Sequence, residues 1–284
     1  MRQKGKGTIQ RQNPCRQNHL FKILSRLPTR RPWRLGTTSY VYPDDIPHNV
    51  ERLAGHTEDI ELVLFESSDF ANLPSPATIR RLDELRLAHG FSFTIHFPID
   101  RQLGSPHAEM RREMLDQILR IVDTVRPLDP FAYILHPEGI AAEADSVRLS
   151  TWQSDMAEGV DRIVAHGIAP HLLAVENLAF PFDWCAPFIE AAGLSVCLDV
   201  GHLWRGGVDV AAHMRRWLPR TRVVHLHGER GGRDHLSLAQ TDRRRLTEFI
   251  GALLAPPSFR GVVTLEVFSF EDTAASIGVL KELL

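Results

Sequence analysis

Short apolar runs alternate with longer amphipathic stretches along most of the chain. Eight of the runs have the composition of β-strands, and they lie at residues 34–38, 60–66, 92–97, 131–136, 172–177, 195–200, 222–227 and 261–268. Between them, stretches such as 109–125 place apolar residues on one helical face. Another helix is expected over 151–166, beginning after a Ser-Thr cap and ending before Gly167. Strands that alternate with helices predict a parallel sheet.

Eight strand–helix units in one domain predict a closed (β/α)8 TIM barrel of class α/β over residues 34–284, with an open doubly wound sheet as the alternative. The length of 284 residues suits a barrel of this class, which typically needs about 250. Hydrophobic residues make up 43%, enough for a large core. No apolar run approaches the roughly 18 residues of a membrane span, so no membrane association is expected.

Alternation within the strands predicts which side chains face the barrel interior. Successive residues of a strand point to opposite faces. In 195–200 and 222–227, small or polar residues share one face and branched apolar residues share the other. We expect the apolar face to pack under the helices and the polar face to point inward. The charged residue comes late in each run, at the end where barrel enzymes place their chemistry.

The predicted strand ends carry an unusual number of carboxylates and imidazoles. Those assigned to the inward face are Glu66, His96, His136, Glu176, Asp199, His225, His227 and Glu266. His202 follows Asp199 in the segment DVGH, where Gly201 is expected to allow a tight turn. Taken singly, each residue is more often a hydrogen-bonded or solvated side chain than a ligand. Together, at one end of one barrel, they indicate a common site.

Imidazole and carboxylate are the ligands of zinc, manganese and iron. Carboxylates buried together repel each other and lose hydration, and a divalent cation relieves both costs. The sequence therefore predicts a site for one or two divalent ions, and three at most. A Gly-rich loop, GERGGRDHLSL, follows the seventh run, and its Arg230, Arg233 and His235 are candidates for reaching the same centre or a phosphate.

Charge is distributed unevenly. Residues 1–34 hold ten Lys or Arg and no acid, so the rest of the chain has 23 basic and 35 acidic residues and a net charge of −12. Residues 1–33 are expected to be a basic, disordered extension, although organelle transit peptides share this pattern. The acidic body argues against a nucleic-acid partner. Three cysteines without a CxxC pair favour a reduced, cytoplasmic setting.

A set of short motifs resembles the xylose-isomerase-like barrel superfamily, which includes AP endonucleases of family 2 and sugar-phosphate isomerases and epimerases. The motifs are TIH at 94–96, LHP at 135–137, VEN at 175–177, LDVGH at 198–202, VHLH at 224–227, DHL at 234–236 and LEV at 265–267. The resemblance implies that Glu176, Asp199, His225 and Glu266 hold a central metal. It also implies that His96 and His136 hold a second one, with His202 a further ligand. The endonuclease branch has an Asp-x-His in the loop after strand seven, where this chain has Arg233, unless Asp234 shifts by one.

Within that superfamily, four stretches resemble the bacterial cobamide-remodelling phosphodiesterases. They are GTTSYVYPDDI at 36–46, IELVLFES at 60–67, IHFPID at 95–100 followed by LGS, and YILHPEG at 133–139. The resemblance implies a metal-dependent hydrolase that cleaves the nucleotide-loop phosphodiester of a cobamide and releases an α-ribazole-type nucleoside.

Three functions therefore remain to be distinguished. In the first, metal-assisted phosphodiester hydrolysis, Glu176 bridges ions, Glu66 or Glu266 accepts a proton, His202 assists, and His227, Arg233 and His235 contact the substrate. The second is a sugar or sugar-phosphate isomerase or epimerase that uses one ion. The third is a non-catalytic metal- or corrinoid-binding protein. The number of histidines favours the first.

Overall fold

The structure is a computed structural model that describes residues 31–67, 71–255 and 257–284. Nearly all of the basic extension expected over 1–33 lies outside them. Eight parallel strands close into one barrel in the order β1-β10-β7-β6-β5-β4-β3-β2, which confirms the predicted fold. The barrel strands are β1 (Arg34–Thr38), β2 (Asp59–Val63), β3 (Ser92–His96), β4 (Ala132–Leu135), β5 (Leu173–Glu176), β6 (Ser195–Asp199), β7 (Thr221–Leu226) and β10 (Val262–Leu265).

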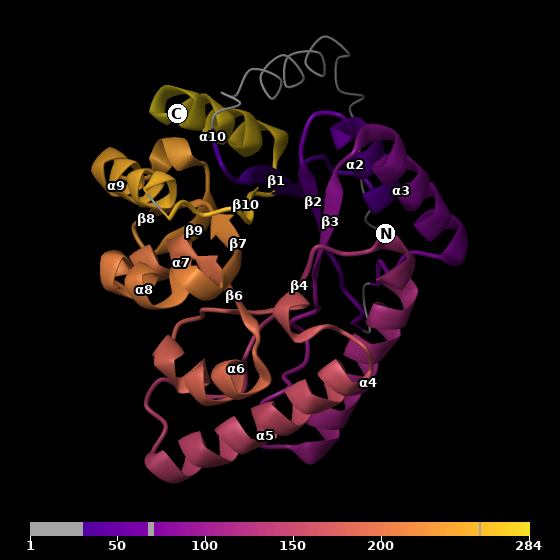
Figure 1. Ribbon diagram of the computed structural model, residues 1–284, viewed down its shortest axis with the longest axis vertical. Helices are drawn as coiled ribbons and strands as arrows, with labels where there is room; N and C mark the ends of the chain where they lie inside the picture. The colour runs from indigo at the N-terminus through magenta and orange to yellow at the C-terminus, as the bar shows by residue number, and fades with distance from the viewer. Residues whose placement is uncertain (1–30, 68–70, 256) are drawn as a thin grey trace, which may run out of the picture.

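Helices surround the strands on the outside (Figure 1). They are α2 (Ile46–Leu53), α3 (Pro76–His89), α4 (Ala108–Val125), α5 (Ser146–Ala165), α6 (Ala186–Ala192), α7 (Val200–Arg205), α8 (Val210–Trp217), α9 (Arg243–Leu254) and α10 (Phe270–Leu283). Helix α5 begins earlier than predicted, because the side chain of Asp145, not the Ser-Thr pair, accepts from the Arg148 amide and caps it. No helix among the described residues combines the length and apolar character needed to cross a membrane.

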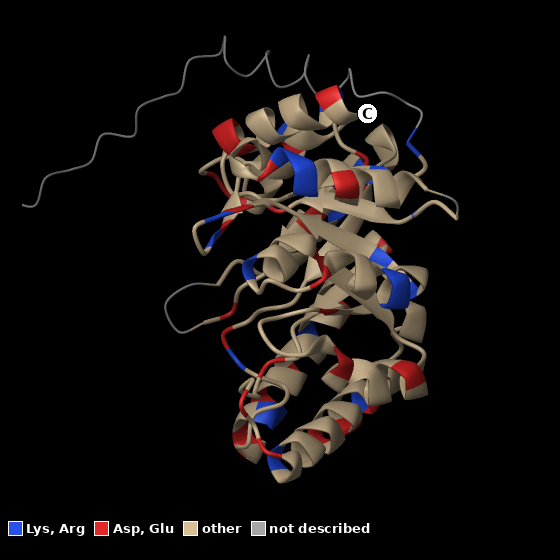
Figure 2. Cartoon of the chain, turned by 90° about the vertical axis from the view of Figure 1, so that its left-hand side faces the viewer, with Lys and Arg blue, Asp and Glu red and all other residues tan. Residues whose placement is uncertain are grey.

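Short helical turns complete the connections: η1 (Arg126–Leu128), η2 (Pro170–Leu172), η3 (Phe182–Cys185), η4 (Leu218–Arg220) and η5 (Leu238–Gln240). A small antiparallel hairpin, β8 (Gly228–Arg230) and β9 (Arg233–Leu236), follows β7 beside the mouth of the barrel. In the view of Figure 2, acidic and basic residues intermix over the helices and form no face of one sign.

The barrel interior confirms the predicted alternation of side chains. The inward-facing residues of β4, β5, β6 and β7 form a separate apolar cluster that includes Ala132, Ile134, Ala174, Cys197 and Val223, each fully buried. The outward-facing strand residues belong to the larger core beneath the helices. Gly36 of β1 faces the interior, where a Cβ would lie 3.1 Å from Val262 and 3.2 Å from Asp59.

The N-terminal end of the barrel is closed by an aromatic ring between two guanidinium groups. The guanidinium carbons of Arg34 and Arg222 lie 4.1 and 3.9 Å from the ring centroid of Phe131. Arg222 also donates to the Phe131 carbonyl at 2.6 Å, and Arg34 donates to Ser92 at 2.6 Å. This layer fixes the floor of the barrel and leaves the opposite end for the site.

Candidate metal centre

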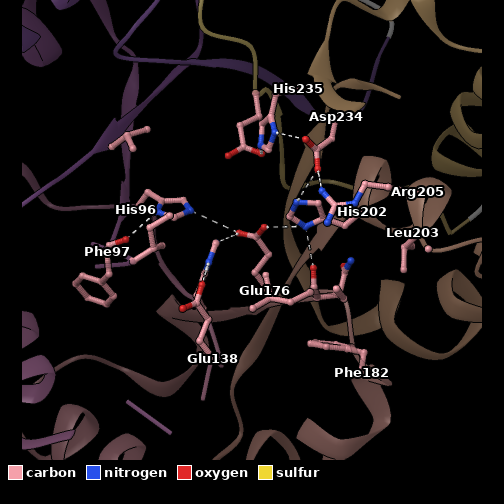
Figure 3. Close-up of a pocket in the computed structure, with 18 of the residues that line it drawn as sticks. His96, Phe97, Glu138, Glu176, Phe182, His202, Leu203, Arg205, Asp234 and His235 are labelled. Carbon is pink, nitrogen blue, oxygen red and sulfur yellow. Dashed lines mark hydrogen bonds and ion pairs between the residues drawn. The ribbon is translucent and has the colours of Figure 1, made fainter. Parts of the chain in front are cut away.

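Glu176, the last residue of β5, lies at the middle of the C-terminal end of the barrel (Figure 3). It is buried, with 1% of the residue exposed. Its Oε2 is 3.6 Å from His96 Nε2, 3.2 Å from His136 Nε2 and 3.3 Å from His225 Nδ1. Its Oε1 is 3.5 Å from His202 Nδ1. One carboxylate therefore faces imidazoles from four strands or strand ends.

A second group of donors gathers around Asp199, the last residue of β6. Asp199 Oδ2 lies 3.1 Å from His227 Nε2 and 3.4 Å from His202 Nδ1. The ring of His235, from β9, stacks on His227 with centroids 4.3 Å apart. His235 Nε2 is 3.4 Å from Glu266 Oε2, and the same oxygen is 3.3 Å from His225 Nδ1. Glu266 thus lies between this group and the imidazole of His225, on β7.

The DVGH segment arranges Asp199 and His202 for a reason that differs from the predicted one. Asp199 caps α7, and its Oδ1 accepts from the His202 amide at 2.7 Å. Gly201 is helical and has no positive φ, so no special turn requires a glycine. Instead, a Cβ at this position would lie 2.0 Å from Cε1 of His227. Gly201 is needed because it leaves room for that imidazole.

The electrostatics of the site depend on pairing between buried acids and imidazoles. Burial alone would raise the pKa of Glu176, but the His136 and His225 imidazoles hold it well below its ordinary value. Burial would lower the pKa of His136, yet the Glu176 carboxylate raises it to about 10. His227 behaves in the same way, and Asp199 raises its pKa to about 9. The buried carboxylates are thus stable as anions only with positive charge nearby, which protonated imidazoles or a metal cation can supply.

Several imidazoles are oriented from behind by an oxygen. His225 Nε2 lies 2.9 Å from Glu61 Oε2, and both side chains are fully buried. His136 Nδ1 lies 3.3 Å from Glu138 Oε1, and His96 Nδ1 lies 2.8 Å from the Phe97 carbonyl. Such contacts fix which ring nitrogen faces a metal. Sequence analysis missed Glu61 and Glu138. The signal for Glu61 was the alternation of β2, in which Ile60 and Leu62 face outward.

Comparison with known proteins identifies the family. Residues 57–283 match the family described as "Xylose isomerase-like TIM barrel". The chain belongs to the xylose isomerase-like TIM-barrel family. The predicted superfamily is therefore confirmed, and family members typically use divalent metal ions. No curated protein matches the chain.

Several solved structures have the same fold as this family member at low sequence identity. A D-tagatose 3-epimerase-like protein superposes with a TM-score of 0.70 at 21% identity, over 88% of this chain and 96% of the other. Endonuclease IV from Thermus thermophilus gives 0.66 at 21% identity, over 88% and 99%. A 3-keto-D-glucoside 4-epimerase from E. coli gives 0.65 at 14% identity, over 88% and 98%. The fold is thus common to epimerases and endonucleases.

The donor set of this xylose isomerase-like barrel fits divalent metal ions. His96, His136 and Glu176 place one donor atom each within 4.8 Å of one another, as do Asp199, His202, His227 and His235. The buried atoms without a hydrogen-bond partner among the described residues include four that belong to the two donor groups and their neighbours. They are Glu176 Oε2, Glu266 Oε2, His136 Nε2 and His225 Nδ1. A cation between them would satisfy the atoms of Glu176, His136 and His225.

Most of the predicted site residues meet in this centre, whereas Glu66 and Arg233 do not. Glu66 follows β2, which ends at Val63, and its carboxylate pairs with Arg120 of α4 at 2.8 Å. The prediction that Glu66 faces inward is therefore wrong in its placement. Arg233 is exposed on β9 and is not among the residues that line the cavity, whereas Asp234 and His235 both line it. In the loop after strand seven, Asp234 rather than Arg233 therefore supplies the carboxylate next to the site.

Above the donors lies a cavity of about 1620 Å³. Its walls are rich in apolar and aromatic side chains, among them Tyr40, Phe65, Phe97, Phe180, Phe182 and Phe270. Three of its lining residues, Ile99, Val208 and Phe268, are large hydrophobics that stay 45–48% exposed. A polar floor of metal-type donors is thus surrounded by an apolar rim.

Proposed function

We propose that the chain is a metal-dependent phosphodiesterase that hydrolyses the nucleotide-loop phosphodiester of cobamides. The observation that carries the proposal is the arrangement of two donor groups joined by Glu176 beneath a wide apolar cavity. A pair of ions about 3.5–4 Å apart is the common arrangement for displacement at phosphorus. One ion suffices for a sugar isomerase, which leaves half of these donors without a role.

The size and lining of the cavity support a large substrate with apolar parts. Pockets for drug-sized ligands have volumes of about 300–1,000 Å³, and this cavity exceeds that range. The exposed side chains of Ile99, Val208 and Phe268 would lie against the periphery of such a ligand. A monosaccharide would leave them in water. A corrinoid presents both apolar substituents and an anionic phosphodiester, which match the rim and the floor.

Bound divalent ions would polarise the phosphoryl oxygens and lower the pKa of a water molecule. The chain's own groups position the reaction. Glu176, with oxygens directed to both donor groups, would hold two ions together. His96, His136, Asp199, His202 and His225 would hold them in place. Glu266 would accept a proton from the attacking water, because it lines the cavity and lies 3.4 Å from His235, which we assign to the substrate.

His227 and His235 were predicted to contact the substrate. His227 is fully buried against Asp199, which suits a metal ligand better than a substrate contact. His235 is 28% exposed at its side chain, so it is the one we assign to the substrate. The charges of the outer helices are intermixed in the view of Figure 2, which supports a small-molecule partner over a nucleic acid.

A sugar epimerase or isomerase with a single ion is the second candidate. His225 Nδ1 lies 3.3 Å from both Glu176 and Glu266, so these residues with Asp199 could surround one ion and leave two glutamates to move protons. Among the similar structures, three carry the names of epimerases and a fourth that of an epimerase-like protein.

A product assay with metal analysis separates the candidates. The full chain is loaded with Zn, Mn or Fe, its metal content is measured, and it is incubated with an intact cobamide, followed by chromatography. We expect a nucleoside and a corrinoid phosphate, at two ions per chain. Failure to release either product with each of the three metals would refute the phosphodiesterase, and one ion per chain with epimerisation of a ketose would support the alternative.

A further inference from the structure

Arg205 ends helix α7, three residues after His202, and its guanidinium lines the cavity (Figure 3). Its Nη1 pairs with Asp234 Oδ2, from strand β9 of the hairpin. Within the described part of the chain, its other N–H groups have no hydrogen-bond partner, and 42% of its side chain is exposed. One edge of the guanidinium is therefore held by Asp234, and its remaining N–H groups are available to a ligand in the cavity.

Asp234 lies beside the second donor group, yet its oxygens are already engaged. Its Oδ2 is bound by Arg205 and lies 4.0 Å from His202 Nε2. Its Oδ1 lies 3.3 Å from His235 Nδ1. A carboxylate next to His202 and His235 would otherwise be free to bind a cation, and here the guanidinium supplies the positive charge.

We propose that Arg205 is the anion-binding residue of the site, and that its guanidinium, held by Asp234, binds an oxygen of the substrate's phosphoryl group beside the metal ions. The inference rests on the proposed phosphodiesterase, because that reaction places an anionic group at the donors. A guanidinium is always charged, is planar, and donates in a fork that matches phosphate oxygens.

A comparison within the same cavity supports the choice of Arg205. Arg216 of α8 also lines the cavity, but its Nε lies 3.2 Å from Asp183 and its Nη2 lies 3.9 Å from Glu190. Its guanidinium also lies over the ring of Trp217. Several of its donors are thus engaged with acids at the mouth. Arg205 has one acid, which sits on the side of the metal-type donors.

The test uses binding of inorganic phosphate by the manganese-loaded full chain, measured by calorimetry, with Arg205→Gln, Arg205→Lys and the control Arg215→Gln. Arg215 is exposed on α8 and does not line the cavity. We expect Arg205→Gln to weaken phosphate binding about tenfold or more, because a charge-assisted hydrogen bond is lost. Arg205→Lys should recover part of it, and Arg215→Gln should stay within about twofold of the parent chain.

Two further readouts separate this role from others. Manganese content should not fall in Arg205→Gln, since the variant frees the Asp234 carboxylate and removes no metal-type donor, and the melting temperature should be unchanged. Phosphate binding within twofold of the parent chain would refute the proposal, as would a loss of manganese that accounts for the weaker binding. If the chain hydrolyses no phosphodiester but still binds phosphate through Arg205, the proposed function fails and the anion site stands.

Discussion

Two buried carboxyl groups at opposite ends of the same barrel have pKa values shifted in opposite directions. Asp59, at the N-terminal end, is fully buried and hydrogen-bonded to Ser92, and burial raises its pKa to about 7. Glu176, at the C-terminal end, is equally buried, yet its pKa is well below its ordinary value. The difference in pKa comes from the neighbours. Asp59 has hydroxyl partners and a single arginine, Arg34, nearby, whereas Glu176 has several imidazoles. Burial is therefore tolerated by protonation at one end and by surrounding cations at the other.

The largest effect that would test this contrast is expected at Glu176. Glu176→Gln keeps the size of the side chain but removes the charge that both donor groups face. We expect a loss in kcat/KM on the order of 10³-fold or more, with loss of bound metal. Circular dichroism of the variant should remain like that of the parent chain. Activity within tenfold of the parent would contradict a central role for this carboxylate.

Asp59→Asn tests the opposite end through the pH dependence of stability. The folded pKa of about 7 lies above the ordinary value of 3.8, so the protonated form stabilises the fold below about pH 4. That contribution is lost as the pH rises from about 4 through 7. Relative to the parent chain, the free energy of unfolding of Asp59→Asn should therefore increase over this window by up to about 4 kcal/mol. Urea unfolding at a series of pH values measures this free energy. If it depends on pH in the same way in both chains, the raised pKa of Asp59, and with it the contrast with Glu176, would be refuted.

A smaller effect is expected from Glu61, which lies between the two ends and orients His225. Glu61→Leu removes the acceptor 2.9 Å from His225 Nε2 and frees the ring to turn. Metal affinity should fall by about 10- to 100-fold, as for other groups that orient a ligand. Competition with a fluorescent chelator measures this. Glu61→Gln retains an acceptor oxygen and should recover part of the affinity, whereas a simple packing role predicts no such recovery.

Much of the barrel and of its C-terminal site could be predicted from the sequence alone. The strands, their alternation and most of the donors were predictable, because apolar runs with a late His, Asp or Glu repeat along the chain. Glu61 was missed because the strand was expected to extend to Glu66, with that residue as its inward-facing acid, whereas β2 ends at Val63. Glu66, beyond that end, was placed in the site although Arg120 binds it outside.

Other features depend on contacts between distant segments, which a pattern along the chain does not contain. The need for a glycine at Gly201 arises from the ring of His227, which comes from another strand. Likewise, an arginine at the exposed end of a short helix has no distinguishing signal, and only the approach of Asp234 from the hairpin indicates that Arg205 belongs to the site.

The stacked ring of Phe131 between Arg34 and Arg222, with the fully buried layer above it, closes the barrel from below. Ions at the proposed centre would therefore enter and leave through the opposite opening, which a substrate would also use. A ligand that fills this opening would trap the ions beneath it until it departs. Exchange of metal with the solvent should accordingly slow when such a ligand is bound, and metal loading would precede its arrival.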